Sequence, residues 1–354
     1  MRDTDPGPDA ALSAVPPARS AGDAGVDPAP DPDSDPATAP DSPAPGTALP
    51  APGTTLPDAA TALPDPDPDQ DPGLFGPDSV TWQLHGDPIM WIAGIRALYL
   101  QALHPRAVRG VAQNSDFRRD AWGRLLRTAS FVGRITYGTT PAAEQAGARI
   151  RGIHRRLTAI DPGTGERFGV DDPELLLWVH CAEIDSYLNV ARRSGFPLTD
   201  AHADAYVDEQ REAARLVGLD PAGVPADTAQ LARYFTEIRP ELAVTPEAFD
   251  VVRFLKAPPV HAVLRPARFA VWPAVSGTAF AALPPYAHAL YGRTAPSRAA
   301  ADRRLRVAGR ALRAIPATVR WQLPPGHILK AVARLGPGTR PSARRLPPNE
   351  PEVP

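Results

Sequence analysis

Residues 88–103 (PIMWIAGIRALYLQAL) are apolar on almost every side of a helix and carry one charged side chain, Arg96. A helix without a polar face must be surrounded by other elements, because none of its sides can face water favourably. The helix is expected to end at His104–Pro105, since a residue before proline disfavours helical geometry. The sequence therefore predicts a bundle of helices packed around this one.

Other segments predict the surrounding helices. Apolar residues recur in them at helical spacing, and residues 172–174 (DPE) supply a capping aspartate, a proline suited to the first turn and a favourable acidic residue. Residues 161–170 (DPGTGERFGV) read as a loop, and no stretch shows the sustained alternation of a strand. The expected fold class is all-α. The predicted helices span residues 116–138, 141–159, 173–193, 200–217, 227–238, 246–255, 283–291, 297–315 and 326–335.

The composition changes sharply near residue 73. Residues 1–73 hold 18 of the 45 prolines and 14 aspartates but no aromatic residue, and their net charge is -12 against +10 for the remainder. Such a segment cannot bury enough apolar surface to offset its chain entropy. The predicted organisation is a disordered acidic, Pro-rich tail over residues 1–73, one helical domain over residues 74–337 and a disordered tail over residues 338–354.

Several classes of protein are disfavoured. The single cysteine, Cys181, excludes an intramolecular disulfide and a cysteine-cluster metal site. There is no apolar run long enough for a transmembrane segment and no secretion signal, so a cytoplasmic location is expected. The excess positive charge is almost all arginine and is scattered, without stacking aromatics, so we expect no nucleic-acid partner. The oligomeric state is not indicated.

Three histidines are candidates for chemistry. His154 follows Ile150 on the apolar side of its predicted helix, and His180 stands in LLLWVH, the most apolar helical stretch. A buried neutral imidazole either forms a hydrogen bond or ligates a metal, and by spacing alone the former is the commoner outcome. His104 lies at a helix end, where it could cap a carbonyl or line a pocket.

The motif RLLRT brings Arg124, Arg127 and Thr128 to one helical face. They could face solvent and pair with acids such as Asp116 or Asp120. They could also form a clamp for a carboxylate, because a guanidinium matches that geometry. Glu183 and Asp185 follow His180 and, if buried, need partners such as these arginines.

The order of four segments resembles the MpaB-like oxygenase family (DUF2236), which includes the latex-clearing rubber oxygenases. The segments are GDPIMWIAGIRALYLQALHP (86–105), SDFRRDAWGRLLRTASFVGRITYG (115–138), ARIRGIHRRLTAIDPGTGERF (148–168) and DDPELLLWVHCAEIDSYL (171–188). The likeness covers roughly residues 77–335. It implies a globin-like helical core that holds haem b, with iron bound by one proximal histidine.

The resemblance also implies roles for individual residues. His154 in IRGIH matches the proximal iron ligand, and His180 in WVH is the alternative ligand or a pocket residue. Arg124 and Thr128 match pocket positions of the family, and Arg127 stands where the rubber oxygenases have a lysine able to cap the iron. Arginine has no lone pair for iron, so Arg127 is expected to donate hydrogen bonds instead. The glutamate base of the rubber oxygenases has no match here, which sets this chain apart from rubber cleavage.

The favoured interpretation is a haem b-dependent oxygenase that acts with dioxygen on an apolar, isoprenoid or lipid-like substrate. In it, Arg124, Arg127 and Thr128 carry the catalytic role, while His154, His180, Arg124 and His104 hold the cofactor. One alternative is a non-catalytic haem-binding or gas-sensing module. Another is a helical interaction protein whose histidines are packing residues and whose tail binds partners.

Overall fold

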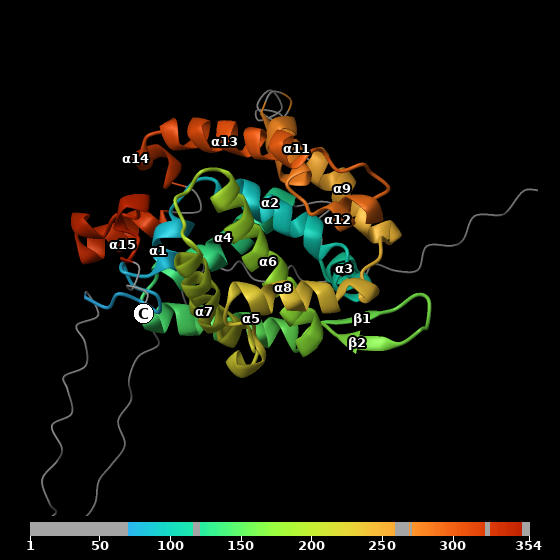
Figure 1. The fold of residues 1–354 in the computed structure, drawn as a ribbon. Coiled ribbons are helices and arrows are strands. Elements are labelled where there is room, and N and C mark those ends of the chain that lie inside the picture. Colours follow the sequence, from blue (N-terminus) through green and yellow to red (C-terminus); the bar gives the residue numbers. More distant parts are fainter. Residues whose placement is uncertain (1–69, 116–120, 259–268, 270, 323–325, 349–354) are drawn as a thin grey trace, which may run out of the picture. The chain divides into compact units, whose positions relative to one another are not determined.

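The computed structural model describes residues 70–115, 121–258, 269, 271–322 and 326–348 (Figure 1). The predicted N-terminal tail up to residue 69, Asp116, Asp120 and residues 349–354 lie outside them. Helices dominate, which confirms the all-α prediction. The α-helices are α1 (Val80–His85), α2 (Met90–Gln101), α3 (Pro105–Asn114), α4 (Ala121–Tyr137), α5 (Thr140–His154), α6 (Pro173–Arg193), α7 (Asp200–Val217), α8 (Thr228–Glu237), α9 (Pro246–Lys256), α11 (Trp272–Ala281), α12 (Pro285–Leu290), α13 (Arg298–Ala314), α14 (Ala317–Arg320) and α15 (His327–Leu335).

Helix α2 lies at the centre of the packing, as its sequence predicts. None of its residues is exposed, and it packs along α6, with α11 and α9 as further neighbours (Figure 1). Side chains also join α2 to α6. The indole Nε1 of Trp178 donates to the Gln101 carbonyl (3.0 Å), and the Gln101 amide donates to the Val179 carbonyl (3.0 Å). Among the described residues, α2 and α6 therefore form the most extensive contact between two helices.

The one arginine of α2 is buried in this contact. Arg96 is 1% exposed, and its guanidinium lies 2.8 Å from the Asp185 carboxylate of α6. It also donates to the Ser186 hydroxyl (2.6 Å) and to the Ala282 carbonyl (3.1 Å). A buried guanidinium is tolerated when its charge and its donors are satisfied in this way. Asp185 thus has an arginine partner, as the sequence suggested, although the arginine comes from α2.

The segment after α5 differs from the sequence prediction. The helix expected over residues 141–159 ends at His154, and β1 (Thr158–Ile160) pairs antiparallel with β2 (Arg167–Gly169). Side chains from the end of α3 satisfy the other edge of β1. Gln113 exchanges hydrogen bonds with the backbone of Ile160 (2.8 and 2.9 Å), and Asn114 donates to the Thr158 carbonyl (2.9 Å). These long-range bonds explain why the chain leaves the helix here.

Four helices were not among the predicted ones: α1, α3, α11 and α14. Two of them begin with good caps, which local patterns could have shown. The Ser79 hydroxyl accepts from the Trp82 amide at the start of α1, and the His104 ring accepts from the Ala107 amide at the start of α3. The remaining predicted helices agree with the structure to within a few residues at each end.

Residues at both ends of the described chain pack against the bundle. The Asp71 carboxylate accepts from the backbone and the hydroxyl of Thr140 (2.6 and 3.0 Å). The sequence predicted a disordered tail from residue 338, but residues 337–348 include two 3-10 helices, Pro337–Thr339 beside α15 and Ala343–Arg345 beside α1. The Trp82 indole donates to the Thr339 carbonyl (2.8 Å), and the Ser342 amide donates to the Gln83 side chain (2.7 Å). Both segments belong to the helical fold.

Candidate functional site at the end of helix α5

His154 is the last residue of α5, and it is half-buried. Its ring Nδ1 is buried and has no hydrogen-bond partner within the described residues. Burial lowers the pKa of His154, and the positive charge of Arg124 lowers it further, while the carboxylate of Asp171 opposes the shift. The imidazole is therefore neutral at neutral pH. A neutral ring with an unused nitrogen has the chemistry of a metal ligand.

The β1–β2 hairpin brings Asp171 back to His154. The chain leaves α5 at His154, turns at the end of the hairpin and returns, and the Val170 amide then donates to the Leu157 carbonyl (2.9 Å). Asp171 follows directly and acts electrostatically on the His154 ring. The sequence around His154 does not indicate that Asp171 lies near it, because 16 residues separate the two. Their proximity depends on the hairpin, which the sequence did not predict.

Arg124 comes to the site from the first turn of α4. It is half-buried, and burial together with the nearby charge of Arg127 lowers its pKa. Its charge acts on His154, so the structure brings these two predicted residues together. Helices α4 and α5 pack against each other, which explains how two residues 30 positions apart in the sequence meet.

The other two residues of RLLRT are less enclosed. Arg127 and Thr128 are exposed on α4, and the Thr128 hydroxyl donates to the Arg124 carbonyl one turn earlier (3.2 Å). The motif therefore contributes one half-buried guanidinium to the candidate site. Its remaining arginine and hydroxyl lie at the surface beside it.

His180 lies in the middle of α6 and is buried. Burial lowers its pKa to about 4, so this ring is also neutral. No hydrogen bond joins it to another described residue. Glu183 follows one turn later, where burial raises the pKa of its carboxyl and the Tyr187 hydroxyl donates to it (2.7 Å). His180 therefore stays a candidate ligand on a helix distinct from that of His154.

A buried polar cluster next to α6 was not found by sequence reasoning. The His85 ring contacts the Thr136 hydroxyl and the Tyr206 hydroxyl, both at 3.0 Å, and lies edge-on to the Tyr187 ring at 5.3 Å. Burial lowers the pKa of His85 to about 3. Each member comes from a different helix, so no local spacing could reveal the cluster. Its polar groups satisfy one another, which marks it as structural.

His104 serves as a cap. Its ring Nδ1 accepts from the Ala107 amide at the start of α3 (3.4 Å), and its Nε2 lies 3.7 Å from the Glu241 carboxylate. The ring also lies 6.1 Å from the Trp178 ring. Both ring nitrogens therefore have neighbours that account for them, and His104 is the residue that caps the start of α3.

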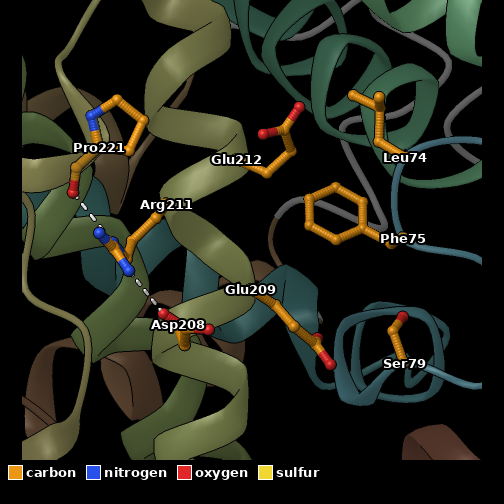
Figure 2. A pocket seen from close by; sticks show the side chains of 8 residues that line it. All are labelled: Leu74, Phe75, Ser79, Asp208, Glu209, Arg211, Glu212 and Pro221. Atoms are coloured by element: carbon orange, nitrogen blue, oxygen red, sulfur yellow. Dashed lines mark hydrogen bonds and ion pairs between the residues drawn. The ribbon is translucent and has the colours of Figure 1, made fainter.

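A hollow of about 520 Å³ lies between α7 and the segment before α1 (Figure 2). Its charged residues already have structural partners. Glu209 accepts from the amides of Val80 and Thr81 (2.9 and 2.7 Å), Arg211 pairs with Asp208 (2.8 Å), and Glu212 pairs with Arg215 (2.6 Å). The side chains that line the hollow therefore join α1 to α7, and its charged groups are already occupied by structural contacts.

The donor set at His154 fits haem better than a bare metal ion. No group of three or more His, Cys, Asp or Glu side chains able to hold a metal ion occurs among the described residues. Haem brings its own four nitrogen ligands and needs one protein side chain, and the buried, unpartnered ring nitrogen of His154 supplies that kind of ligand. Arg124 beside it has the chemistry to pair with a propionate.

Residues 82–314 match the family described as ER-bound oxygenase mpaB/B'/Rubber oxygenase, catalytic domain. The chain belongs to this family of oxygenases, and the resemblance identified from its motifs is confirmed. The matched span includes every candidate residue discussed above. No curated protein and no solved structure matches the chain. In the described part of the chain, no helix has the length and apolar character needed to cross a membrane.

Substituting the two charged neighbours of His154 should move its pKa in opposite directions. In haem-free protein, Asp171→Asn removes a charge that stabilises the imidazolium and should lower the pKa of His154. Arg124→Gln removes a repelling charge and should raise it. The measurement is a pH titration of the His154 ring by NMR. Shifts in the same direction, or no shift in either variant, would contradict the placement of these three residues around one site.

Proposed function

We propose that this protein is a haem b-dependent oxygenase that acts with dioxygen on an apolar, isoprenoid or lipid-like substrate. The observation that carries the proposal is the neutral, buried and unpartnered nitrogen of His154. It lies within the family-matched span, and the half-buried guanidinium of Arg124 is near enough for its charge to act on the ring. When bound, haem b supplies the redox chemistry by which dioxygen is used.

Each residue of the site then has a task. His154 presents a ring nitrogen as the single protein ligand. The negative charge of Asp171 stabilises positive charge on the His154 ring. Arg124 binds a propionate through its guanidinium donors. Arg127 and Thr128 lie on α4 within one turn of Arg124, and we assign them to donating hydrogen bonds toward dioxygen or substrate. For this, the Thr128 hydroxyl must leave the Arg124 carbonyl.

Apolar side chains on α4, which carries Arg124, and on α6, which carries His180, support an apolar substrate. Leu125 and Val132 of α4 and Leu177 and Val179 of α6 are half-buried apolar residues that pack against the main core. Side chains of this kind would recognise a substrate by shape and burial rather than by charge. The free energy of transfer of an alkene chain from water into these surroundings is favourable by about 0.8 kcal/mol per buried methylene.

The test of the proposal is haem content. The full-length protein, expressed with ample haem precursor, should bind about one haem per chain by the pyridine haemochrome assay, since one proximal histidine holds one haem. His154→Ala should lose the Soret band. His327→Gln, which removes a histidine that contacts Ser130 elsewhere on α4, should keep it.

The other outcomes separate the alternatives. A Soret band that survives in His154→Ala and is lost in His180→Ala would move the ligand to α6. Haem that binds without dioxygen uptake in the presence of isoprenoid alkenes such as squalene would favour the gas-sensing module. A protein that folds normally and contains no haem would contradict the proposal and leave the helical interaction protein.

A further inference from the structure

A second pocket, of about 550 Å³, lies between the end of α9, α11, α12 and α13. Figure 1 shows these helices on a different side of the fold from α5 and the hairpin. Three basic residues, Lys256, Arg293 and Arg304, line the pocket. No acidic side chain lines it in the part of the chain that the structure describes. The pocket is therefore strongly positive and separate from the His154 site.

The three cations of this pocket have no acidic partner among the described residues. Lys256 Nζ lies over the Phe280 ring, 5.5 Å from its centroid, and neither Arg293 nor Arg304 forms an ion pair there. Neighbouring arginines behave differently. On α13, Asp302 pairs with Arg193 at 2.6 Å and lies 3.9 Å from Arg298. Asp302 thus neutralises Arg193 and Arg298, whereas no described carboxylate neutralises the three cations of the pocket.

His288 of α12 lines the same pocket and is 2% exposed. Neither of its ring nitrogens forms a hydrogen bond of ordinary geometry within the described residues, although the backbone of Ala281 lies close enough to interact with the ring. The ring lies edge-on to Phe280, with centroids 5.0 Å apart. A buried imidazole with both nitrogens unpaired costs more free energy than an apolar side chain of the same shape. A ligand group in the pocket would remove that cost.

The floor of the pocket is held rigidly. The Ser276 hydroxyl of α11 is 2.7 Å from the Tyr99 hydroxyl of α2, and the Tyr291 hydroxyl donates to the Tyr99 carbonyl (2.6 Å). The Arg293 amide donates to the His288 carbonyl (2.9 Å), which keeps these two pocket residues side by side. Because α2 is central to the fold, these bonds fix the floor of the pocket, while Lys256, Arg293 and Arg304 are exposed at its rim.

We propose that this pocket binds a phosphate or diphosphate group carried by a small apolar organic ligand. Lys256, Arg293 and Arg304 neutralise the anion, and His288 forms a hydrogen bond with it. Three cations favour a multiply charged phosphate over a single carboxylate. The apolar walls, which include Phe280 and Pro273, accept the organic part. The inference is independent of haem binding.

Isothermal titration of the full-length protein with octyl phosphate tests the proposal. We expect one site per chain and an affinity at least tenfold higher than for inorganic phosphate, because the octyl chain also contacts the apolar walls. Octanol should not bind. Vesicles that contain phosphatidic acid form a second arm. Binding of both probes would assign the site to a lipid headgroup, and binding of octyl phosphate alone would assign it to a soluble phosphate ester.

Matched variants locate the binding. Arg304→Gln should weaken octyl phosphate binding at least tenfold, whereas Arg303→Gln, which removes the same charge one residue away and outside the pocket, should change it less than twofold. His288→Phe should weaken binding while the melting temperature stays at or above that of the wild type. Haem content should be unchanged in all three variants.

Three results would overturn the proposal. One is the absence of octyl phosphate binding, even if vesicles bind. Another is an equal loss of affinity in Arg303→Gln and Arg304→Gln, which would indicate diffuse surface charge. The third is unchanged binding in His288→Phe, which would make the histidine a packing residue.

Discussion

Replacing Asp185 with asparagine should lower the free energy of unfolding by about 3–5 kcal/mol, since removing one partner leaves a buried charge without compensation. The charge left behind is Arg96, whose side chain is 2% exposed in the α2–α6 contact. The Ser186 hydroxyl and the Ala282 carbonyl would still accept hydrogen bonds, but neither carries charge. Chemical denaturation of wild type and variant measures the difference.

The control for this prediction is Asp208→Asn on α7. Asp208 pairs with Arg211 at 2.8 Å, but its side chain is 61% exposed, and exposed pairs contribute about 0–1 kcal/mol. If the two variants lose the same stability, the ion pair of α2 and α6 does not behave as a buried one. Restoration of stability by adding Arg96→Met to Asp185→Asn would show that the cost comes from the stranded guanidinium.

Acid should destabilise the fold through His85. Its pKa is about 3 in the folded protein, well below its ordinary value of 6.5, because the ring is buried beside Thr136 and Tyr206. As the pH falls below about 6.5, the unfolded chain takes up a proton and the folded chain does not, so the free energy of unfolding decreases. The decrease reaches about 4–5 kcal/mol at pH 3, where the folded protein begins to bind the proton as well.

The measurement is the denaturant midpoint and slope at several pH values between 7 and 3.5, for wild type and His85→Phe. The variant has no titrating group at this position, so its stability should depend less steeply on pH over this range. Its stability at pH 7 reports separately on the lost hydrogen bonds to Thr136 and Tyr206. Parallel pH profiles for the two proteins would contradict the prediction.

The sequence predicts the helical fold well where the signals are local. The Asp172 side chain caps α6 by accepting from the Glu174 amide (3.0 Å), as the DPE motif indicates. The apolar pattern of residues 88–103 correctly places α2 at the centre. The hairpin was missed because Gln113 and Asn114, more than 40 residues earlier, satisfy the edge of β1.

The candidate site is predicted only in part for the same reason. His154 and Arg124 stand out in sequence because a cationic or ligand-type side chain among apolar neighbours is costly. Asp171 does not stand out, since its position depends on the turn of the hairpin. His288 does not stand out either, because α12 is a short helix without a motif. The turn residues Asp161, Gly163 and Gly165 between two short β-prone stretches were the available signal for the hairpin.

The contacts of Asp71 and of residues 337–348 also define which residues a truncated fragment must include to keep the packing of the helical fold. The family match covers residues 82–314, yet Trp82 donates its indole hydrogen bond to Thr339, and Arg334 donates to the Tyr137 and Asp71 carbonyls. A fragment limited to the matched span would lose these partners and uncover the Trp82–Tyr137 pair. A fragment that retains the bonds of Asp71, Thr339 and Ser342 must run at least from residue 71 to residue 342, so the packed helical fold extends beyond the span by which the family is recognised.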